Sequence, residues 1–343
     1  MEPGRTERFG DRPVRPGHTN GPGRPRICGF DPQRVMAGVC LLRGHSPGAS
    51  GGGLPDEPGS DAGSSLDAGP PHGTGVMRRA GRTLREMRTI VGSFAMARRF
   101  RESDTRVLLI LGTVRSGSTV LGHILNSNPE VSGYGETLTS YRSVPRLAGL
   151  MSNVRRELGT EAAGVPWLYD KMLHDWLLLG DDVLRSERVS FLILLRDPEE
   201  TLSSMHRLQE HVPGARLSRM ERAVPYLRDR LDTLVEMAAR VGDPGRALFV
   251  TYGQLVEQTE DVFRAIETHL DLSTPLTEEY ELTPATGRAL IGDPSPVIRT
   301  GRLDRTRTGV RVPADVPERE LEEWKCRFKR GVEDLSRTCT TVG

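Results

Sequence analysis

Residues 108–119 read Leu108-Leu109-Ile110-Leu111-Gly112-Thr113-Val114-Arg115-Ser116-Gly117-Ser118-Thr119. The unbroken apolar run at the start is typical of a strand that is buried on both faces of a parallel sheet. Gly112 and Gly117 then bracket a short loop, and a helical pattern follows from about residue 117. This order of strand, tight loop and helix predicts the first unit of a parallel α/β sheet.

The loop between the two glycines has the Gly-x-x-x-x-Gly spacing of a P-loop, which turns successive backbone N–H groups toward one anion. The helix that begins near Gly117 adds the positive end of its dipole. Ser116, Ser118 and Thr119 supply hydroxyl donors at the same place. We therefore predict a cradle for a phosphate-sized group; a strand-to-helix turn that holds no ligand is the alternative.

The loop departs from a Walker A loop directly after its second glycine. Ser118 stands where that motif has lysine, and the cation is Arg115, inside the loop. Without the lysine, chemistry on the β- and γ-phosphates of ATP loses its usual charge. The sequence therefore disfavours an ATP-dependent P-loop kinase, which stays open as an alternative function.

Strands and helices alternate along the rest of the chain. Strands are predicted at 107–111, 167–170, 189–195 and 247–251. Helices are predicted at 117–127, 137–158, 172–186, 198–210, 215–241, 253–270 and 317–335. This alternation predicts an α/β fold, a three-layer sandwich with a central, mostly parallel sheet of the P-loop NTPase-like kind.

A second anion site is predicted where the strand at 189–195 ends. Arg196 follows that strand directly, at the edge of the sheet where such folds bind ligands. Pro198 suits the first turn of the next helix, and Asp197 is placed to cap it or to orient a neighbour. Arg196 and Ser204 can hold one phosphate through a charge-assisted fork and a hydroxyl.

Together the two motifs resemble those of the PAPS-dependent sulfotransferases, in their bacterial and tyrosylprotein-like branches. The run Arg115 to Thr119 is similar to the family's 5′-phosphosulfate loop, and Arg196 with Ser204 is similar to its 3′-phosphate motif. The resemblance implies transfer of the sulfonate of PAPS to an acceptor hydroxyl or amine, in line and without a metal. A carbohydrate, a glycolipid and a small metabolite all stay open as acceptors, and so does a non-catalytic module that only binds PAP.

Two later segments extend the resemblance. The segment 250–255 looks like a strand-to-helix turn of the family, which implies that Tyr252 contacts the adenine. The segment 298–302 resembles a late basic loop that closes over the 3′-phosphate. This resemblance implies that Arg299, Thr300 and Gly301 help to bind the 3′-phosphate.

The resemblance also points to catalytic residues. Glu136 follows the first helix, where the next strand should deliver a residue to the ligand edge, and its position resembles the catalytic glutamate of the tyrosylprotein branch. His174 is the second candidate base, although its spacing from Lys171 differs from that of the cytosolic branch. Lys171 would reach the sulfonate or the bridging oxygen as a point charge, and Arg115 would share that role.

The flanking segments have a different character. Residues 1–75 hold 17 of the 38 glycines and 11 of the 24 prolines, which predicts a disordered head, or an upstream extension of a chain that starts at Met77. Residues 76–105 predict a basic amphipathic lead-in helix, with eight arginines at 76–101. Packing on the main domain at 106–343 is favoured over peripheral contact with a membrane.

The composition restricts the kinds of partner, cellular location and metal site that this protein can have. Lys+Arg is 47 and Asp+Glu is 46, a balance that gives no support for a nucleic-acid partner. No apolar run approaches the roughly 18 residues of a transmembrane helix, and the start lacks the apolar core of a secretory signal. We therefore predict a cytoplasmic protein; its oligomeric state stays open. Cys28, Cys40, Cys326 and Cys339 show no C-x-x-C spacing, so unpaired thiols and no metal site are expected, with a Cys326–Cys339 bridge left open.

Overall fold

The computed structural model describes residues 95–159, 161, 164–212, 216–283, 286–287, 293, 295–306 and 309–343. The predicted disordered head at 1–75 lies outside these residues, and so does the lead-in helix upstream of residue 95. Cys28, Cys40 and Met77 lie outside them as well.

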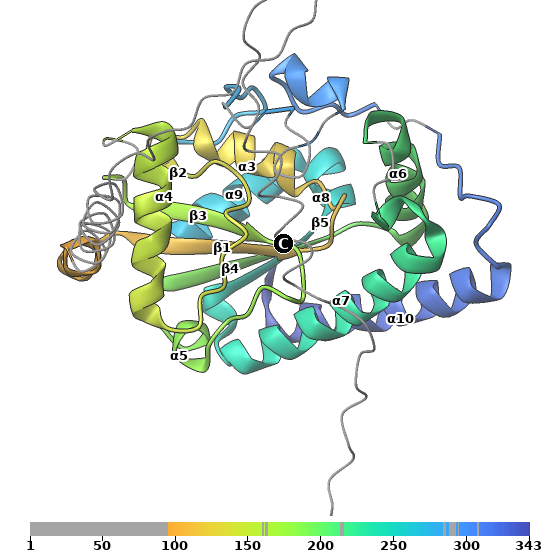
Figure 1. The fold of residues 1–343 in the computed structure, drawn as a ribbon, viewed down its shortest axis with the longest axis horizontal. Coiled ribbons are helices and arrows are strands. Elements are labelled where there is room, and N and C mark those ends of the chain that lie inside the picture. Colours follow the sequence, from red (N-terminus) through yellow and green to blue (C-terminus); the bar gives the residue numbers. More distant parts are fainter. Residues whose placement is uncertain are drawn as a thin grey trace, which may run out of the picture. The chain divides into compact units, whose positions relative to one another are not determined.

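The described residues form a parallel sheet in the strand order β2-β3-β1-β4-β5-β6 (Figure 1). The strands are β1 (Arg106–Gly112), β2 (Val131–Ser132), β3 (Trp167–Met172), β4 (Val189–Leu195), β5 (Ala247–Thr251) and β6 (Thr340–Thr341). The four longer strands confirm the sequence predictions to within two residues. β2 and β6 were not predicted, because two residues are too short to show a periodicity.

Helices cover both faces of the sheet, which confirms the predicted three-layer sandwich (Figure 1). One face carries α3 (Ser118–Asn126), α8 (Tyr252–Glu257) and α9 (Thr259–Leu270). The other carries α4 (Ala148–Leu158), α5 (Asp181–Leu184), α6 (Pro198–His211), α7 (Met220–Val241) and α10 (Glu318–Thr338). Because side chains alternate along a strand, Leu108 and Ile110 of β1 enter the first core, whereas Leu109 and Leu111 enter the second.

Short 3₁₀ helices complete the architecture, and they are η1 (Val144–Leu147), η3 (Arg216–Ser218), η4 (Pro244–Arg246) and η5 (Pro296–Thr300). The helix predicted at 253–270 is divided at Gln258 into α8 and α9. The predictions at 117–127, 198–210, 215–241 and 317–335 are confirmed as α3, α6, α7 with η3, and α10.

Two helix predictions were wrong over part of their length. Residues 137–143 are not helical, because Leu138 has a left-handed φ of 53° and Tyr141 forms a parallel β-bridge with Leu179, in which its carbonyl accepts from the Gly180 amide at 2.9 Å. Within 172–186 only α5 is helical, since the carbonyls of Met172 and Leu173 accept hydrogen bonds from α7 side chains instead of from the following turn.

The lead-in helix is described from residue 95 and runs to residue 102. Phe100 is buried, and the Arg188 guanidinium lies 4.4 Å from its ring. Arg188 Nη2 donates to the carbonyls of Phe100, Ser103 and Thr105 at 2.9, 2.6 and 2.7 Å. These contacts hold the described end of the helix and the residues before β1 against Arg188, which directly precedes β4.

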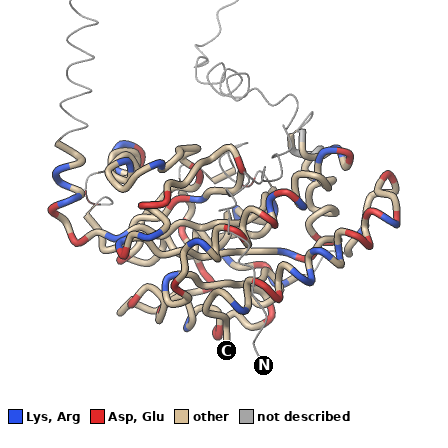
Figure 2. The backbone as a smooth tube through the Cα atoms, turned by 90° about the horizontal axis from the view of Figure 1, so that it is seen from below, with Lys and Arg blue, Asp and Glu red and all other residues tan. Residues whose placement is uncertain are grey.

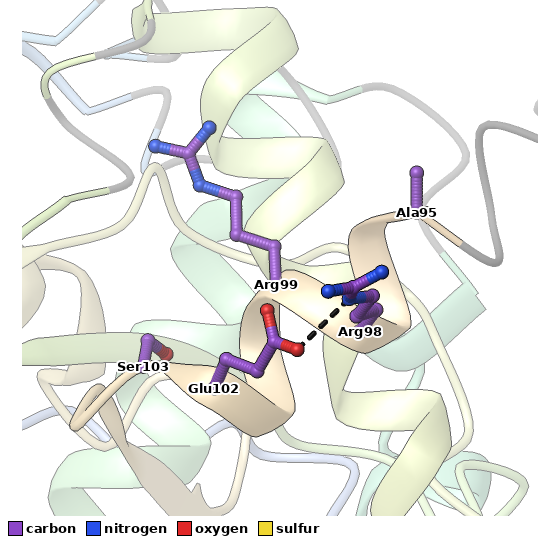
Figure 3. Close-up of a pocket in the computed structure, with 5 residues that line it drawn as sticks. All are labelled: Ala95, Arg98, Arg99, Glu102 and Ser103. Atoms are coloured by element: carbon purple, nitrogen blue, oxygen red, sulfur yellow. Dashed lines mark hydrogen bonds and ion pairs between the residues drawn. The ribbon is translucent and has the colours of Figure 1, made fainter.

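Residues of this helix and of the turn after it line a pocket (Figure 3). Its lining residues are Ala95, Arg98, Arg99, Glu102 and Ser103. Arg98 Nε pairs with Glu102 at 2.8 Å, and both side chains are exposed, so the pair adds little stability. The pocket shares no residue with the predicted site.

Positively and negatively charged residues are mixed along the described chain rather than gathered in separate regions (Figure 2). Lys and Arg are interspersed with Asp and Glu along the chain, as the near-zero net charge suggests. In the part of the chain that the structure describes, no helix combines the length and the apolar character needed to cross a membrane. Cys326 and Cys339 are both free, which confirms unpaired thiols for these two residues.

Gly331 marks a close contact between α10 and α7. A Cβ at this position would lie 2.8 Å from Cδ1 of the buried Leu231. We expect Gly331→Ala to lower the free energy of unfolding by about 1–3 kcal/mol through overpacking. Gly149→Ala in α4 is the matched control, because nothing lies within 4 Å of the added methyl group. Urea denaturation should separate the two variants, and equal midpoints would contradict the packing described here.

Candidate active site

The C-terminal ends of the parallel strands bring the predicted site residues to one edge of the sheet. The phosphate-type loop follows β1, Lys171 is the last residue but one of β3, Arg196 follows β4, and Tyr252 follows β5. Glu136 comes shortly after β2, at the same edge, and lies 3.6 Å from Lys171. Residues that are far apart in the sequence are therefore neighbours because parallel strands end together.

The loop after β1 has a backbone conformation that suits an anion. Arg115 has φ 67° and Gly117 has φ 93°, both in the left-handed region, and α3 begins at the next residue without a side-chain cap. A Cβ on Gly117 would lie 2.8 Å from Cε2 of Tyr252, so glycine permits the loop and this ring to approach. The Ser116 hydroxyl is fully buried and has no hydrogen-bond partner among the described residues. An orphaned donor at this point fits a phosphate or sulfonate oxygen.

Lys171 connects this loop to Glu136. Its side chain is 1% exposed, and Nζ lies 3.1 Å from Thr119 Oγ1 and 3.6 Å from Glu136 Oε1. A buried ammonium needs such partners, because the cost of leaving water is several kcal/mol. The lysine is therefore a fixed positive charge beside the loop.

Glu136 is held in a nearly dry environment that favours its neutral form. Burial raises the pKa of Glu136 to about 7; the neighbouring Lys171 charge opposes this shift and the Asp170 charge adds to it. A carboxyl group that titrates near neutrality suits a general base.

His174 lies beside Glu136 but in a different state. Its Nε2 is 4.0 Å from Glu136 Oε2, which is too far for a hydrogen bond, and its ring stacks on Trp176 at 5.5 Å. Burial lowers the pKa of His174 to about 4, and the nearby Arg230 charge contributes in the same direction. The imidazole is therefore neutral at pH 7 and a weaker base than Glu136.

The two anion motifs meet through Arg115. Arg115 Nε donates to Ser204 Oγ at 3.0 Å, and Nη1 donates to Asp293 Oδ1 at 3.0 Å. Arg196 Nε donates to Glu200 at 3.0 Å, and its guanidinium lies 4.1 Å from the centre of the Tyr252 ring. Arg115, Arg196, Ser204 and Tyr252 thus form one cluster next to the loop.

The start of α6 explains why Arg196 and Ser204 face this cluster. Asp197 caps the helix, since its Oδ1 accepts from the amides of Glu199 at 2.9 Å and Glu200 at 3.1 Å. Pro198 occupies the first turn, where its missing N–H costs nothing. The predicted capping role of Asp197 is confirmed.

The late basic segment has its own local order. The Thr300 hydroxyl donates to the carbonyls of Val297 and Arg302 at 2.8 and 3.2 Å, and Gly301 ends η5 with φ 71°. The exposed Arg299 lies against Gly287, where a Cβ would be 2.9 Å from the Arg299 Cζ atom. In the described part of the chain, no hydrogen bond or ion pair joins this segment to Arg196 or Ser204.

Two residues of α7 that the sequence analysis did not assign to the site hold its walls together. Arg230 is buried, and it donates through Nε to the Gly112 carbonyl at 2.9 Å, through Nη2 to the Met172 carbonyl, and through Nη1 to Asp175 at 2.9 Å. The Tyr226 hydroxyl accepts from the Val114 amide at 3.0 Å and donates to the Leu173 carbonyl at 2.6 Å. An arginine within the apolar stripe of α7 was the available signal for Arg230.

His123 was also missed, and no sequence pattern marks it. It is buried in α3, with Nδ1 2.8 Å from the Thr119 carbonyl and Nε2 2.6 Å from Thr286 Oγ1. Burial lowers the pKa of His123. It therefore links the phosphate-loop helix to the segment around Thr286 as a neutral ring.

Comparisons with known proteins give one family. Residues 152–276 match a family model described as "Sulfotransferase family". The matched range contains Lys171, His174, Arg196, Ser204 and Tyr252, and it begins after the phosphate loop and Glu136. This match confirms, over the matched residues, the resemblance predicted from the motifs. No curated protein matches the chain.

Several solved structures are similar to this chain at low sequence identity. One is a sulfotransferase domain from the curacin biosynthetic pathway, with 13% identity, TM-score 0.42, and coverage of 66% of this chain and 97% of that chain. A mouse sulfotransferase complexed with PAP has 14% identity and TM-score 0.40, covering 68% and 87%. A sulfotransferase from Mycobacterium avium has 14% identity and TM-score 0.38, covering 71% and 80%.

The raised pKa of Glu136 makes stability depend on pH. The group titrates near 4.5 when exposed and at about 7 in the folded protein, so the native state binds more protons than the unfolded state between these values. The neutral Glu136 side chain therefore makes its full contribution to the free energy of unfolding below pH 4.5, and this contribution is lost as the pH rises through 7.

We expect Glu136→Gln to match the wild type in stability near pH 4 and to exceed it by roughly 1–3 kcal/mol at pH 8. Urea denaturation at several pH values measures this difference. The exposed Glu260→Gln is the control and should follow the wild type throughout. If the free energy of unfolding changes with pH in the same way for the wild type and Glu136→Gln, the pKa of the Glu136 carboxyl group is not shifted.

Proposed function

We propose that the domain at 106–343 is a PAPS-dependent sulfotransferase that moves a sulfonate group to an acceptor hydroxyl or amine. The observation that carries this proposal is one cluster at the sheet edge. Ser116 offers a buried hydroxyl without a partner, Lys171 offers a fixed charge 3.6 Å from a carboxylate, and that carboxylate, Glu136, titrates near neutrality. Anion binding, charge neutralisation and proton acceptance are thereby available within one site.

The residues of the cluster fit the two anionic ends of PAPS. The loop of Arg115 to Thr119 would hold the 5′-phosphosulfate, and Arg196 with Ser204 would hold the 3′-phosphate. The Tyr252 ring lies against the Arg196 guanidinium. As the resemblance implies, this ring would also contact the adenine. Arg299, Thr300 and Gly301 would contribute to the 3′-phosphate from the late segment. When bound, PAPS supplies the sulfonate and a leaving group whose bridging oxygen gains negative charge.

The chain's own residues account for the rest of the chemistry. Glu136 would accept the acceptor proton at a carboxylate oxygen, and its burial keeps the acceptor oxygen or nitrogen away from bulk water. Lys171 Nζ and the Arg115 guanidinium would stabilise the charge that develops on the transferring group, without reorganisation because both are already held. His174 stays the second candidate base.

Nucleotide preference tests the proposal against its alternatives. We expect PAP to raise the melting temperature more than ATP with Mg²⁺, because two separated anion motifs match a 3′,5′-bisphosphate. Arg196→Ala and Ser116→Ala should each weaken PAP binding, measured by calorimetry. Arg264→Ala is the control, since this exposed arginine in α9 pairs only with Asp261 among the described residues. A larger shift with ATP would favour a kinase, and binding of PAP without any transfer would favour a non-catalytic module.

Turnover tests the catalytic roles. We expect Lys171→Ala and Arg115→Ala each to lower the transfer rate on the order of 10²–10³-fold, because each removes a charge that stabilises the transition state. The measurement uses labelled PAPS with a cell extract, followed by identification of the labelled product. Near-normal rates in both variants would contradict the assigned roles.

The same assay separates the two candidate bases. Glu136→Gln should abolish most transfer, whereas His174→Ala should retain it, since a ring with a pKa of about 4 accepts protons poorly at neutral pH. The reverse result would assign the base to His174. The labelled product also decides among a carbohydrate, a glycolipid and a small metabolite.

A further inference from the structure

Asp170 is a buried carboxylate that makes no ion pair within the described residues. Its side chain lies on the opposite face of β3 from Lys171 and is fully buried. Oδ1 accepts from the amides of Thr137 and Lys171, both at 2.9 Å. Oδ2 accepts from the hydroxyls of Thr137 at 2.5 Å and Tyr141 at 2.7 Å. Four neutral donors therefore replace the water that a carboxylate normally requires.

These hydrogen bonds fix the chain on one side of Glu136, and β3 fixes it on the other. Thr137 is held through both its amide and its hydroxyl by Asp170. Gly135 is held through its carbonyl, which accepts from the Lys171 amide at 3.3 Å. Glu136 is thus a single residue between two anchors on the same strand. It reaches Lys171, which follows Asp170 directly, at 3.6 Å.

The backbone of this segment needs such anchoring. Gly135 has φ 120° and Leu138 has φ 53°, so both lie outside the conformations of a regular strand or helix. A left-handed leucine is unfavourable by itself, and the surrounding contacts must compensate for it. The segment from 137 to 143 also has a helical sequence pattern, so it has a competing local conformation.

We propose that Asp170 is a positioning residue for Glu136. By binding Thr137 and Tyr141 it fixes the segment that directly follows Glu136 and holds the Glu136 carboxylate against Lys171. This inference rests on the proposed function only where it refers to Glu136 as the base. The anchoring itself is a property of the folded chain and can be measured without any substrate.

The charge of Asp170 has a second effect on the same carboxyl group. Burial is the largest cause of the raised pKa of Glu136, and the Lys171 charge opposes it. The Asp170 charge raises this pKa further. The other charged and titratable groups around the pair are His174 from the turn after β3, Tyr134 and Tyr141 from the segment after β2, and Tyr226 and Arg230 from α7. Removing the Asp170 charge alone should therefore lower the pKa of Glu136.

The pair Asp170→Asn and Asp170→Ala separates shape from charge. Asparagine keeps Oδ1 for the two amides, and its amide nitrogen can donate to the two hydroxyls, so it preserves the anchoring while removing the charge. Alanine removes both. Asp182→Ala is the matched control, because Asp182 accepts from the Val144 amide at 3.0 Å and anchors only the far end of the same segment.

The first measurements need no substrate. Amide hydrogen exchange should become faster at Thr137 in Asp170→Ala but stay slow in Asp170→Asn and Asp182→Ala. Carboxyl NMR titration, with Glu136→Gln to identify the signal, should show a lower Glu136 pKa in Asp170→Asn. Unchanged protection of Thr137 in Asp170→Ala would overturn the proposal. If Asp170→Ala does not fold, Thr137→Val with Tyr141→Phe removes the two hydroxyl bonds and should loosen the same amide; unchanged protection there would also overturn it.

Transfer kinetics complete the test. Asp170→Ala should reduce kcat on the order of 10²-fold with the KM for PAPS unchanged, since a displaced base leaves donor binding intact. Asp170→Asn should recover most of kcat and move the acid limb of the pH profile to lower pH. Equal losses in both variants, or a loss confined to KM, would overturn the positioning role. A wild-type protein that neither binds PAP nor transfers sulfonate would refute the proposed function, while the exchange and titration results would still decide the role of Asp170.

Discussion

The site depends on the burial of one lysine. Lys171 is the last residue but one of β3, and its ammonium group is shielded from solvent; such a charge persists only if fixed partners replace its water. Thr119 provides one partner from the helix after the phosphate loop, and Glu136 provides the other from the segment after β2. The loop, the strand and the carboxylate are therefore linked through a single cation.

Parallel strand topology makes this link possible. Neighbouring strands end at one edge, so β1, β3 and β4 deliver the loop, Lys171 and Arg196 to the same place, although their sequence positions are far apart. The cost is a set of main-chain carbonyls that leave the sheet without strand partners. Arg230 from α7 binds two of them, at Gly112 and Met172, and Tyr226 binds a third at Leu173. One helix thereby fixes both walls of the site.

The same edge shows how burial sets the chemistry of individual groups. Glu136, Asp170 and His174 are ordinary titratable residues in the sequence, yet burial raises the pKa of the two carboxyl groups and lowers that of the imidazole. The resulting pKa values are about 7, 6 and 4, respectively. Of the three groups, the two carboxyl groups therefore titrate closest to neutral pH, a property that the local sequence around them does not indicate.

Local pattern in the chain was sufficient for the strands, most helices, the phosphate-type loop and the Asp197 cap, because apolar runs, glycine spacing and capping residues act over a few neighbouring positions. It was insufficient for residues 137–143 and 173–180, which are held instead by the Tyr141–Leu179 bridge and by hydrogen bonds to Asp170, Tyr226 and Arg230. Those partners are 29 to 58 positions away from the groups they bind. The resemblance pointed to Glu136 and Lys171, but their contact at 3.6 Å and the titration of each group were decided by tertiary packing, because desolvation and through-space charge depend on neighbours that only the folded chain brings together.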